Sequence, residues 1–190
     1  MQSERAVLPC EPPEVLGDDD LRLRSLTGDD WTLEHQMSRV PDVVEWTTLR
    51  PDLSVEQAKE RVGREAQWRR DAAGAVYVIE RDGHVVGTAG LWARDDGQIE
   101  LFYGLLPQGR GRGSASKAAR LLADWADHAG LGRVILTTYP GNAASQRTAT
   151  RAGFQHVGSE RRTVKDNVVE LLVWARPTTS VPPSSTADPA

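Results

Sequence analysis

One stretch of the chain constrains the fold more than any other. A strand-like run, Ile99–Leu105, leads through Pro107 into a turn with three glycines, and a long helical pattern follows directly. Apolar residues recur with helical spacing from position 115 to position 129, and charged residues take the opposite face. The pattern predicts an amphipathic helix over Gly111–Ala129 that packs one face against a sheet.

The rest of the pattern predicts a mixed α/β sheet. A capping box at Ser54 and Gln57 predicts a helix over Val55–Arg70. Further helices are expected at Asp29–Val40 and Asn142–Ala152, with a loop around Val40–Trp46. The expected strands are Leu21–Leu26, Ala75–Glu80, His84–Leu91, Ile99–Leu105, Arg133–Thr138, Phe154–Arg161 and Asn167–Ala175. A run of three consecutive strands in this order excludes a doubly wound parallel sheet.

Length and composition favour one domain with loose ends. The 190 residues suit a single core, which we place at residues 18–176. Residues 1–17 and 177–190 are rich in proline and poor in apolar residues, so we expect disordered tails. The single cysteine, Cys10, excludes an intramolecular disulfide. No apolar run is long enough for a membrane span, and the sequence predicts a cytoplasmic protein with no membrane contact.

The charge pattern excludes several classes of function. A net charge of −4 argues against a broad nucleic-acid-binding surface. The four histidines lie in separate expected elements without ligand spacing, so no metal site is predicted.

The glycine-rich turn predicts a local anion site. Backbone N–H groups in the first turn of a helix are free and lie at the positive end of its dipole. Arg110, Arg112 and Lys117 add positive charge around them. The P-loop pattern fails because Gly113 is followed by Ser114 and alanine, and the dinucleotide fingerprint lacks its third glycine.

A family resemblance explains the spacing of the glycines in this turn, which neither of those two patterns fits. The register Glu-Leu-x-Tyr-x-Leu-x-Pro-x-x-Arg-Gly-x-Gly, at residues 100–113, resembles motif A of the GNAT superfamily of acetyl-CoA-dependent N-acetyltransferases, in its RimJ/RimL-like branch. Asn142-x-x-Ser145, followed by a Gly-Phe pair at residues 153–154, is similar to a second motif of that branch. The resemblance spans residues 21–174. It implies the GNAT fold, a mostly antiparallel central sheet flanked by helices.

The resemblance also implies roles for individual residues. The turn would hold the diphosphate of acetyl-CoA, while backbone groups of Leu105 and Leu106 would pair with the pantetheine arm and polarise the thioester carbonyl. Asn142 would contact the pantetheine or an ordered water as well as capping its helix, and Ser145 would protonate the departing thiolate. Many members use a tyrosine at the position of Ala149 instead. The expected acetyl-CoA contacts are Leu105, Leu106, Gln108, Gly109, Arg110, Gly111, Arg112, Gly113, Ser114 and Asn142.

A general base is harder to assign. Glu100 is the candidate, because several family members place a base at the entry of this strand; a salt-bridged structural carboxylate is the alternative. Near pH 7.4 an α-amine is about 20–30% neutral, whereas a lysine amine is only about 0.1% neutral. The lack of an obvious base pair therefore favours an α-amine acceptor.

The expected function is transfer of an acetyl group from acetyl-CoA to a primary amine, foremost a protein or peptide N-terminal α-amine. The alternatives are a small-molecule N-acetyltransferase for polyamines or antibiotics, and a non-catalytic acyl-CoA sensor. Asp42, Glu45 and Trp46 are candidates for the acceptor side. Phe102 and Gly104 depart from the branch pattern beside the expected thioester. Homodimers occur in this branch, but nothing in the sequence locates an interface.

Overall fold

One eight-stranded sheet organises the chain, of which this computed structural model describes residues 6–177. The strand order is β1-β2-β3-β4-β5-β6-β8-β7, and every neighbouring pair is antiparallel except β5 with β6. The predicted mixed, mostly antiparallel sheet is thus confirmed. The strands are β1 (Val15–Gly17), β2 (Leu21–Ser25), β3 (Gly74–Arg81), β4 (His84–Ala93), β5 (Ile99–Leu105), β6 (Val134–Thr138), β7 (Gln155–Val164) and β8 (Asn167–Ala175).

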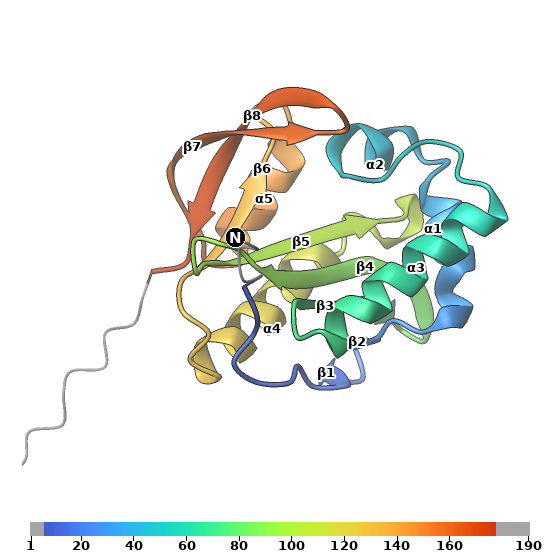
Figure 1. Ribbon diagram of the computed structural model, residues 1–190, viewed down its shortest axis with the longest axis horizontal. Helices are drawn as coiled ribbons and strands as arrows, with labels where there is room; N and C mark the ends of the chain where they lie inside the picture. Colours follow the sequence, from blue (N-terminus) through green and yellow to red (C-terminus); the bar gives the residue numbers. More distant parts are fainter. Residues whose placement is uncertain (1–5, 178–190) are drawn as a thin grey trace, which may run out of the picture.

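Helices cover both faces of the sheet (Figure 1). A 3-10 turn, η1 (Gly28–Asp30), leads into α1 (Trp31–Met37), which packs with α2 (Pro41–Trp46) and α3 (Val55–Arg70) in one apolar cluster. The second cluster joins the opposite face to α4 (Ser114–His128) and α5 (Ala143–Arg151). Successive side chains of β5 therefore meet different helices, because they alternate between the two faces.

The parallel pair β5–β6 is incomplete. The two strands pair only from Ile99 with Val134 to Leu101 with Leu136. Beyond that point β5 keeps its ladder with β4 only, up to Leu105. Figure 1 shows β6 and the β7–β8 hairpin diverging from β5 on the side of α5. We call the resulting gap in strand pairing the β5–β6 opening; it leaves backbone groups of residues 102–105 without a strand partner on that side.

The N-terminal segment differs from the expected disordered tail. Within the described residues, Val15–Gly17 forms β1 and pairs with β2. Leu8 is buried in the larger core, and the Tyr77 hydroxyl donates to the Pro13 carbonyl at 2.7 Å. Prolines lack an N–H but keep the carbonyl acceptor, which is how this segment attaches. Of the expected C-terminal tail, residues 178–190 lie outside the described part.

Helix boundaries also differ from the sequence pattern. Gly113 adopts a left-handed φ of +76°, so α4 begins at Ser114 rather than at Gly111. The expected helix Asp29–Val40 is shorter, and the expected loop after it contains α2, which Pro41 opens at its first helical position. Within residues 6–177, no helix is long and apolar enough to cross a membrane.

Candidate active site

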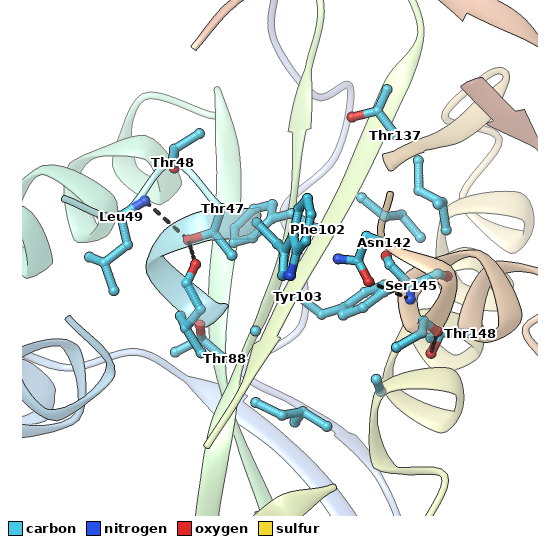
Figure 2. Close-up of a pocket in the computed structure, with 18 of the residues that line it drawn as sticks. Thr47, Thr48, Leu49, Thr88, Phe102, Tyr103, Thr137, Asn142, Ser145 and Thr148 are labelled. Atoms are coloured by element: carbon cyan, nitrogen blue, oxygen red, sulfur yellow. Dashed lines mark hydrogen bonds between the residues drawn. The ribbon is translucent and has the colours of Figure 1, made fainter. Parts of the chain in front are cut away.

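A cavity of about 520 Å³ follows the β5–β6 opening and continues beneath α1 and α3. One end carries the glycine turn and the start of α5, and the other end is lined by helix residues such as Glu34 and Glu65. We call the first of these the coenzyme end, after the expectation from the sequence. Figure 2 shows β5 crossing the middle, with Tyr103, Asn142 and Ser145 on one side and Thr47 and Thr88 on the other.

The glycine turn offers a narrower set of free amides than the sequence predicted. It begins as a 3-10 turn, η2 (Pro107–Gly109). Gly109 N–H donates to the Leu106 carbonyl at 2.9 Å, and Arg110 N–H donates to Pro107 at 3.2 Å. These two amides serve the turn itself. The amides suited to an anion are therefore those from Gly111 into the first turn of α4, which precede the regular helix ladder.

The cations around the turn are paired within the protein. Arg110 contacts Asp42 at 2.6 Å, Arg112 contacts Asp82 at 2.6 Å, and Lys117 contacts Asp18 at 2.8 Å. The hydrogen bonds that the Lys117 ammonium group donates to Asp18 and Asp20 raise the pKa of Lys117. Because each cation already has a carboxylate, the backbone amides and the helix dipole supply the uncompensated positive potential at the turn.

Ser145 lies in the first turn of α5, where three groups meet. Asn142 caps this helix as predicted, and its Oδ1 accepts from the Ser145 N–H at 2.9 Å. The Tyr103 hydroxyl lies 2.8 Å from Ser145 Oγ, across the opening (Figure 2). Burial raises the pKa of Tyr103 to about 12, so the phenol stays protonated. The sequence did not point to this pair, because the two residues lie 42 positions apart in the chain.

Glu100 is buried and fully engaged. Its Oε1 accepts from Thr137 Oγ1 at 2.8 Å and from Arg162 at 3.0 Å. Its Oε2 lies 3.0 Å from Arg94 and 3.0 Å from Arg162. A carboxylate has about four acceptor sites. Base action at Glu100 would have to break one of these contacts, so the geometry favours the structural alternative.

Each of the two departures from the branch pattern matches a neighbouring residue in space. A methyl group at Gly90 of β4 would collide with the ring of Phe102 on β5. A methyl group at Gly104 would lie 2.8 Å from Met37 Cε of α1. The bulk at position 102 thus fits above a glycine, and the missing side chain at 104 makes room for α1.

The expected acetyl-CoA contacts separate into two groups. Six of them line the cavity, namely Leu105, Arg110, Gly111, Gly113, Ser114 and Asn142. The other four, Leu106, Gln108, Gly109 and Arg112, do not. Leu106 is buried, and its N–H donates to the Val86 carbonyl at 2.9 Å. It therefore anchors the turn, and its assignment as a direct contact stays a prediction.

The fold and the opening define an acyltransferase of the GNAT class, and comparison supports this assignment. The chain belongs to the GNAT acetyltransferase family, because the family model described as "Acetyltransferase (GNAT) domain" matches residues 20–155. This family model describes an acetyltransferase domain, and it covers most of the sheet together with α4 and α5. No curated protein matches the sequence significantly.

Solved structures share the fold at low sequence identity. One is an acetyltransferase from Salmonella typhimurium that modifies the N-terminal serine of ribosomal protein L7/L12, with 17% identity, 86% of this chain and 98% of that one covered, and a TM-score of 0.76. A second is a microcin C7 self-immunity acetyltransferase solved with acetyl-CoA and AMP. It is 12% identical, covers 84% of this chain and 93% of its own, and has a TM-score of 0.75. A third is the aminoglycoside acetyltransferase AAC(6')-Ib, solved with coenzyme A and kanamycin. It is 18% identical, covers 82% of this chain and 95% of its own, and has a TM-score of 0.66. Their acceptors differ widely, so the shared fold does not identify the acceptor here.

Within residues 6–177, no group of three or more histidine, cysteine, aspartate or glutamate side chains is placed to hold a metal ion.

Proposed function

We propose that the protein acetylates a primary amine by direct attack on the thioester, and that the preferred acceptor is the N-terminal α-amine of a protein or peptide. The observation that carries this proposal is the Ser145–Tyr103 pair at the β5–β6 opening, in the same cavity as the glycine turn. Acetyl-CoA supplies an acetyl thioester, whose carbonyl carbon a neutral amine attacks and whose thiolate then departs.

The residues of the opening suit that cosubstrate. Backbone groups of residues 102–105 lack a strand partner toward β6. The Leu105 carbonyl accepts from the Arg110 side chain at 2.9 Å, and the remaining groups suit an extended amide-bearing arm. Gly111 has a φ of +78° and open space where a side chain would be, so the backbone can approach a diphosphate closely. Asn142 holds the first turn of α5, which fixes the position of Ser145.

Ser145 is proposed as the proton donor to the thiolate sulfur. Because the Tyr103 phenol stays protonated, it can donate to Ser145 Oγ and leave the serine hydrogen free for the leaving group. The α-amine gives its own proton to water, and Ser145 recovers a proton from solvent. Ala149 is fully buried, so no side chain at that position competes for the role.

The choice of an α-amine rests on the state of Glu100. With its acceptor sites occupied by two arginines and a threonine, this carboxylate is not free to deprotonate an ammonium group. An acceptor that is already partly neutral near pH 7 needs no such base, whereas a lysine side chain does.

Coenzyme A release with a panel of amines tests the proposal. The panel contains a peptide with a free N-terminus and no lysine, the same peptide with a blocked N-terminus and one lysine, and small amines. We expect turnover of the first peptide, and a loss of turnover in Ser145→Ala. Turnover of the lysine peptide alone would contradict the α-amine assignment. Acetyl-CoA binding without turnover of any amine would favour a sensor.

A further inference from the structure

A buried charge cluster lies at the end of the cavity beneath α1 and α3. Arg61 Nε donates to Glu34 Oε2 at 2.8 Å, and Arg61 Nη2 lies 2.9 Å from Glu65 Oε1. Both glutamate side chains are 3% exposed, and Arg61 is 22% exposed. All three residues line the cavity that contains the coenzyme site.

The cluster is incomplete in charge and in hydrogen bonds. Two carboxylates share one guanidinium, which leaves one negative charge without a counterion inside the cluster. Glu65 Oε2 is buried and has no hydrogen-bond partner. A buried polar atom without a partner is costly, and a buried unpaired charge is more so. The positive group that could balance it from the same helix is Arg64, whose side chain is exposed.

The surroundings of the cluster suit an organic cation. Trp68, Trp92 and Phe102 also line the cavity, and Trp68 lies three residues after Glu65 on α3. Trp92 stacks on Phe102 with ring centroids 5.1 Å apart, and Trp68 meets Trp92 edge-on at 6.3 Å. Aromatic faces attract ammonium and guanidinium groups, and this attraction grows when the cation loses water. The neighbouring strand residues Val76 and Thr88 add no charge.

We propose that this end of the cavity is a subsite for a second cationic group on the acceptor, beside the amine that is acetylated, and that the Glu65 carboxylate is its principal partner. The inference rests on the proposed function, since it presumes an amine acceptor in this cavity. The acceptor class becomes more specific: a primary amine that carries another ammonium or guanidinium group. A basic peptide N-terminus and a small polyamine both present this chemistry.

A dependence on pH follows from the same geometry. Burial, and then the neighbouring charge of Glu34, raise the pKa of Glu65 to about 7, while Arg61 and Arg64 oppose the shift. A bound cation favours the ionised carboxylate, so binding at the subsite releases a proton below that pH. Affinity for the second cation therefore strengthens as the pH rises through about 7, and a Glu65→Gln variant lacks this component.

Matched acceptors and matched variants test the subsite. The acceptors are the diaminoalkanes from 1,3-diaminopropane to 1,6-diaminohexane against n-butylamine, and the dipeptide amide Ser-Arg against Ser-norleucine. The variants are Glu65→Gln and, as a control on the same helix, the exposed Glu60→Gln. Acetyl-CoA turnover gives kcat and KM. Thermal unfolding with each amine in the presence of coenzyme A measures binding independently of turnover.

We expect the wild type to prefer the dicationic member of at least one pair. In Glu65→Gln the KM for that acceptor should rise about 10-fold or more, the size of a lost charged hydrogen bond. The KM for acetyl-CoA and for the monocationic partner should stay unchanged, and Glu60→Gln should match the wild type. Which pair responds distinguishes a peptide from a polyamine.

Two results would overturn the subsite. One is an equal response of wild type and Glu65→Gln to every matched pair, and the other is no preference for the second charge in binding or turnover. If no amine is acetylated while a diamine still stabilises the coenzyme A complex through Glu65, the proposed function fails, and Glu65 is a cation-binding site but not an acceptor subsite. If Glu65→Gln does not fold, Glu34→Gln is measured in its place, with the same expected loss of preference for the second charge.

Discussion

The two sides of β5 differ in the chemical groups that line them. The coenzyme side, from Tyr103 across the opening to Ser145 and the glycine turn, uses backbone amides, helix caps and one hydrogen-bonded hydroxyl pair. The acceptor side, from Phe102 and Gly104 to α1 and α3, uses packed aromatic rings and buried carboxylates. One strand serves both because its side chains alternate between the faces.

The comparison teaches that the two sides constrain different properties. In the proposed function, backbone geometry on the coenzyme side recognises the diphosphate and the amide-bearing arm of acetyl-CoA, which is the same molecule for every acceptor. The solved structures that share this fold are described with different acceptors, a ribosomal protein N-terminus in one and kanamycin in another. Changes on the coenzyme side should therefore affect all acceptors equally, and changes on the acceptor side should discriminate among them.

The largest effect is expected from Ser145→Ala on the coenzyme side. Loss of a proton donor typically costs 10²-fold or more, so kcat should fall about 100-fold for every acceptor while the KM for acetyl-CoA stays close to that of the wild type. Steady-state coenzyme A release measures both constants, with the exposed Ser159→Ala as control. Retained transfer in Ser145→Ala would remove the serine from the mechanism.

Gly111→Ala should weaken acetyl-CoA binding about 10-fold, because a methyl group would keep the diphosphate away from the amides of the turn. Gly97→Ala is a matched control: Gly97 has the same φ of +78° and the same open space, but lies in the β4–β5 turn. Both variants carry the same backbone strain. Titration of the two with acetyl-CoA separates them, and equal affinities would contradict the proposed role of the turn.

A smaller effect is expected from Tyr103→Phe. Removal of the phenolic oxygen loses one hydrogen bond to Ser145, worth about 1 kcal/mol, so kcat should fall about 5-fold. The double variant Tyr103→Phe with Ser145→Ala should be no slower than Ser145→Ala alone, because the phenol acts through the serine. Additive losses would show that Tyr103 has a separate role.

The smallest kinetic effect is expected from Glu100→Gln. This change leaves kcat within about 2-fold if the carboxylate is structural, yet it removes the charge that Arg94 and Arg162 share. Both arginines keep Glu160 as a partner, so the loss of their hydrogen bonds to Glu100 should lower the free energy of unfolding by about 1–3 kcal/mol. Denaturant unfolding and coenzyme A release are measured together. A stable variant with a 100-fold lower kcat would restore Glu100 as the base.

Much of the coenzyme side could be predicted from the sequence. The helical period of α4, the glycines before it and the asparagine cap of α5 are local signals. The succession of helices and strands along the chain, apart from β1 and α2, followed from the same kind of pattern. The start of α4 was wrong by three residues, because periodicity does not show that Gly113 is left-handed.

The acceptor side could not be predicted in this way. Glu34 and Glu65 look like ordinary solvated glutamates in helical patterns, and only their burial against the sheet makes them notable. The contact of Tyr103 with Ser145 joins residues 42 positions apart across the opening, so no local spacing signals it. The composition of the N-terminal segment likewise gave no signal that its proline carbonyls accept hydrogen bonds from the rest of the domain.

The central claim is that the β5–β6 opening and the glycine turn bind acetyl-CoA, and thermal unfolding tests it most directly. A ligand at 100 times its Kd adds about 2.7 kcal/mol, and about 1 kcal/mol moves the midpoint of a domain of this size by roughly 2–4 °C. Acetyl-CoA and coenzyme A should each raise the midpoint by about 5–10 °C, whereas NAD and ATP should not. An unchanged midpoint at saturating acetyl-CoA would contradict the account.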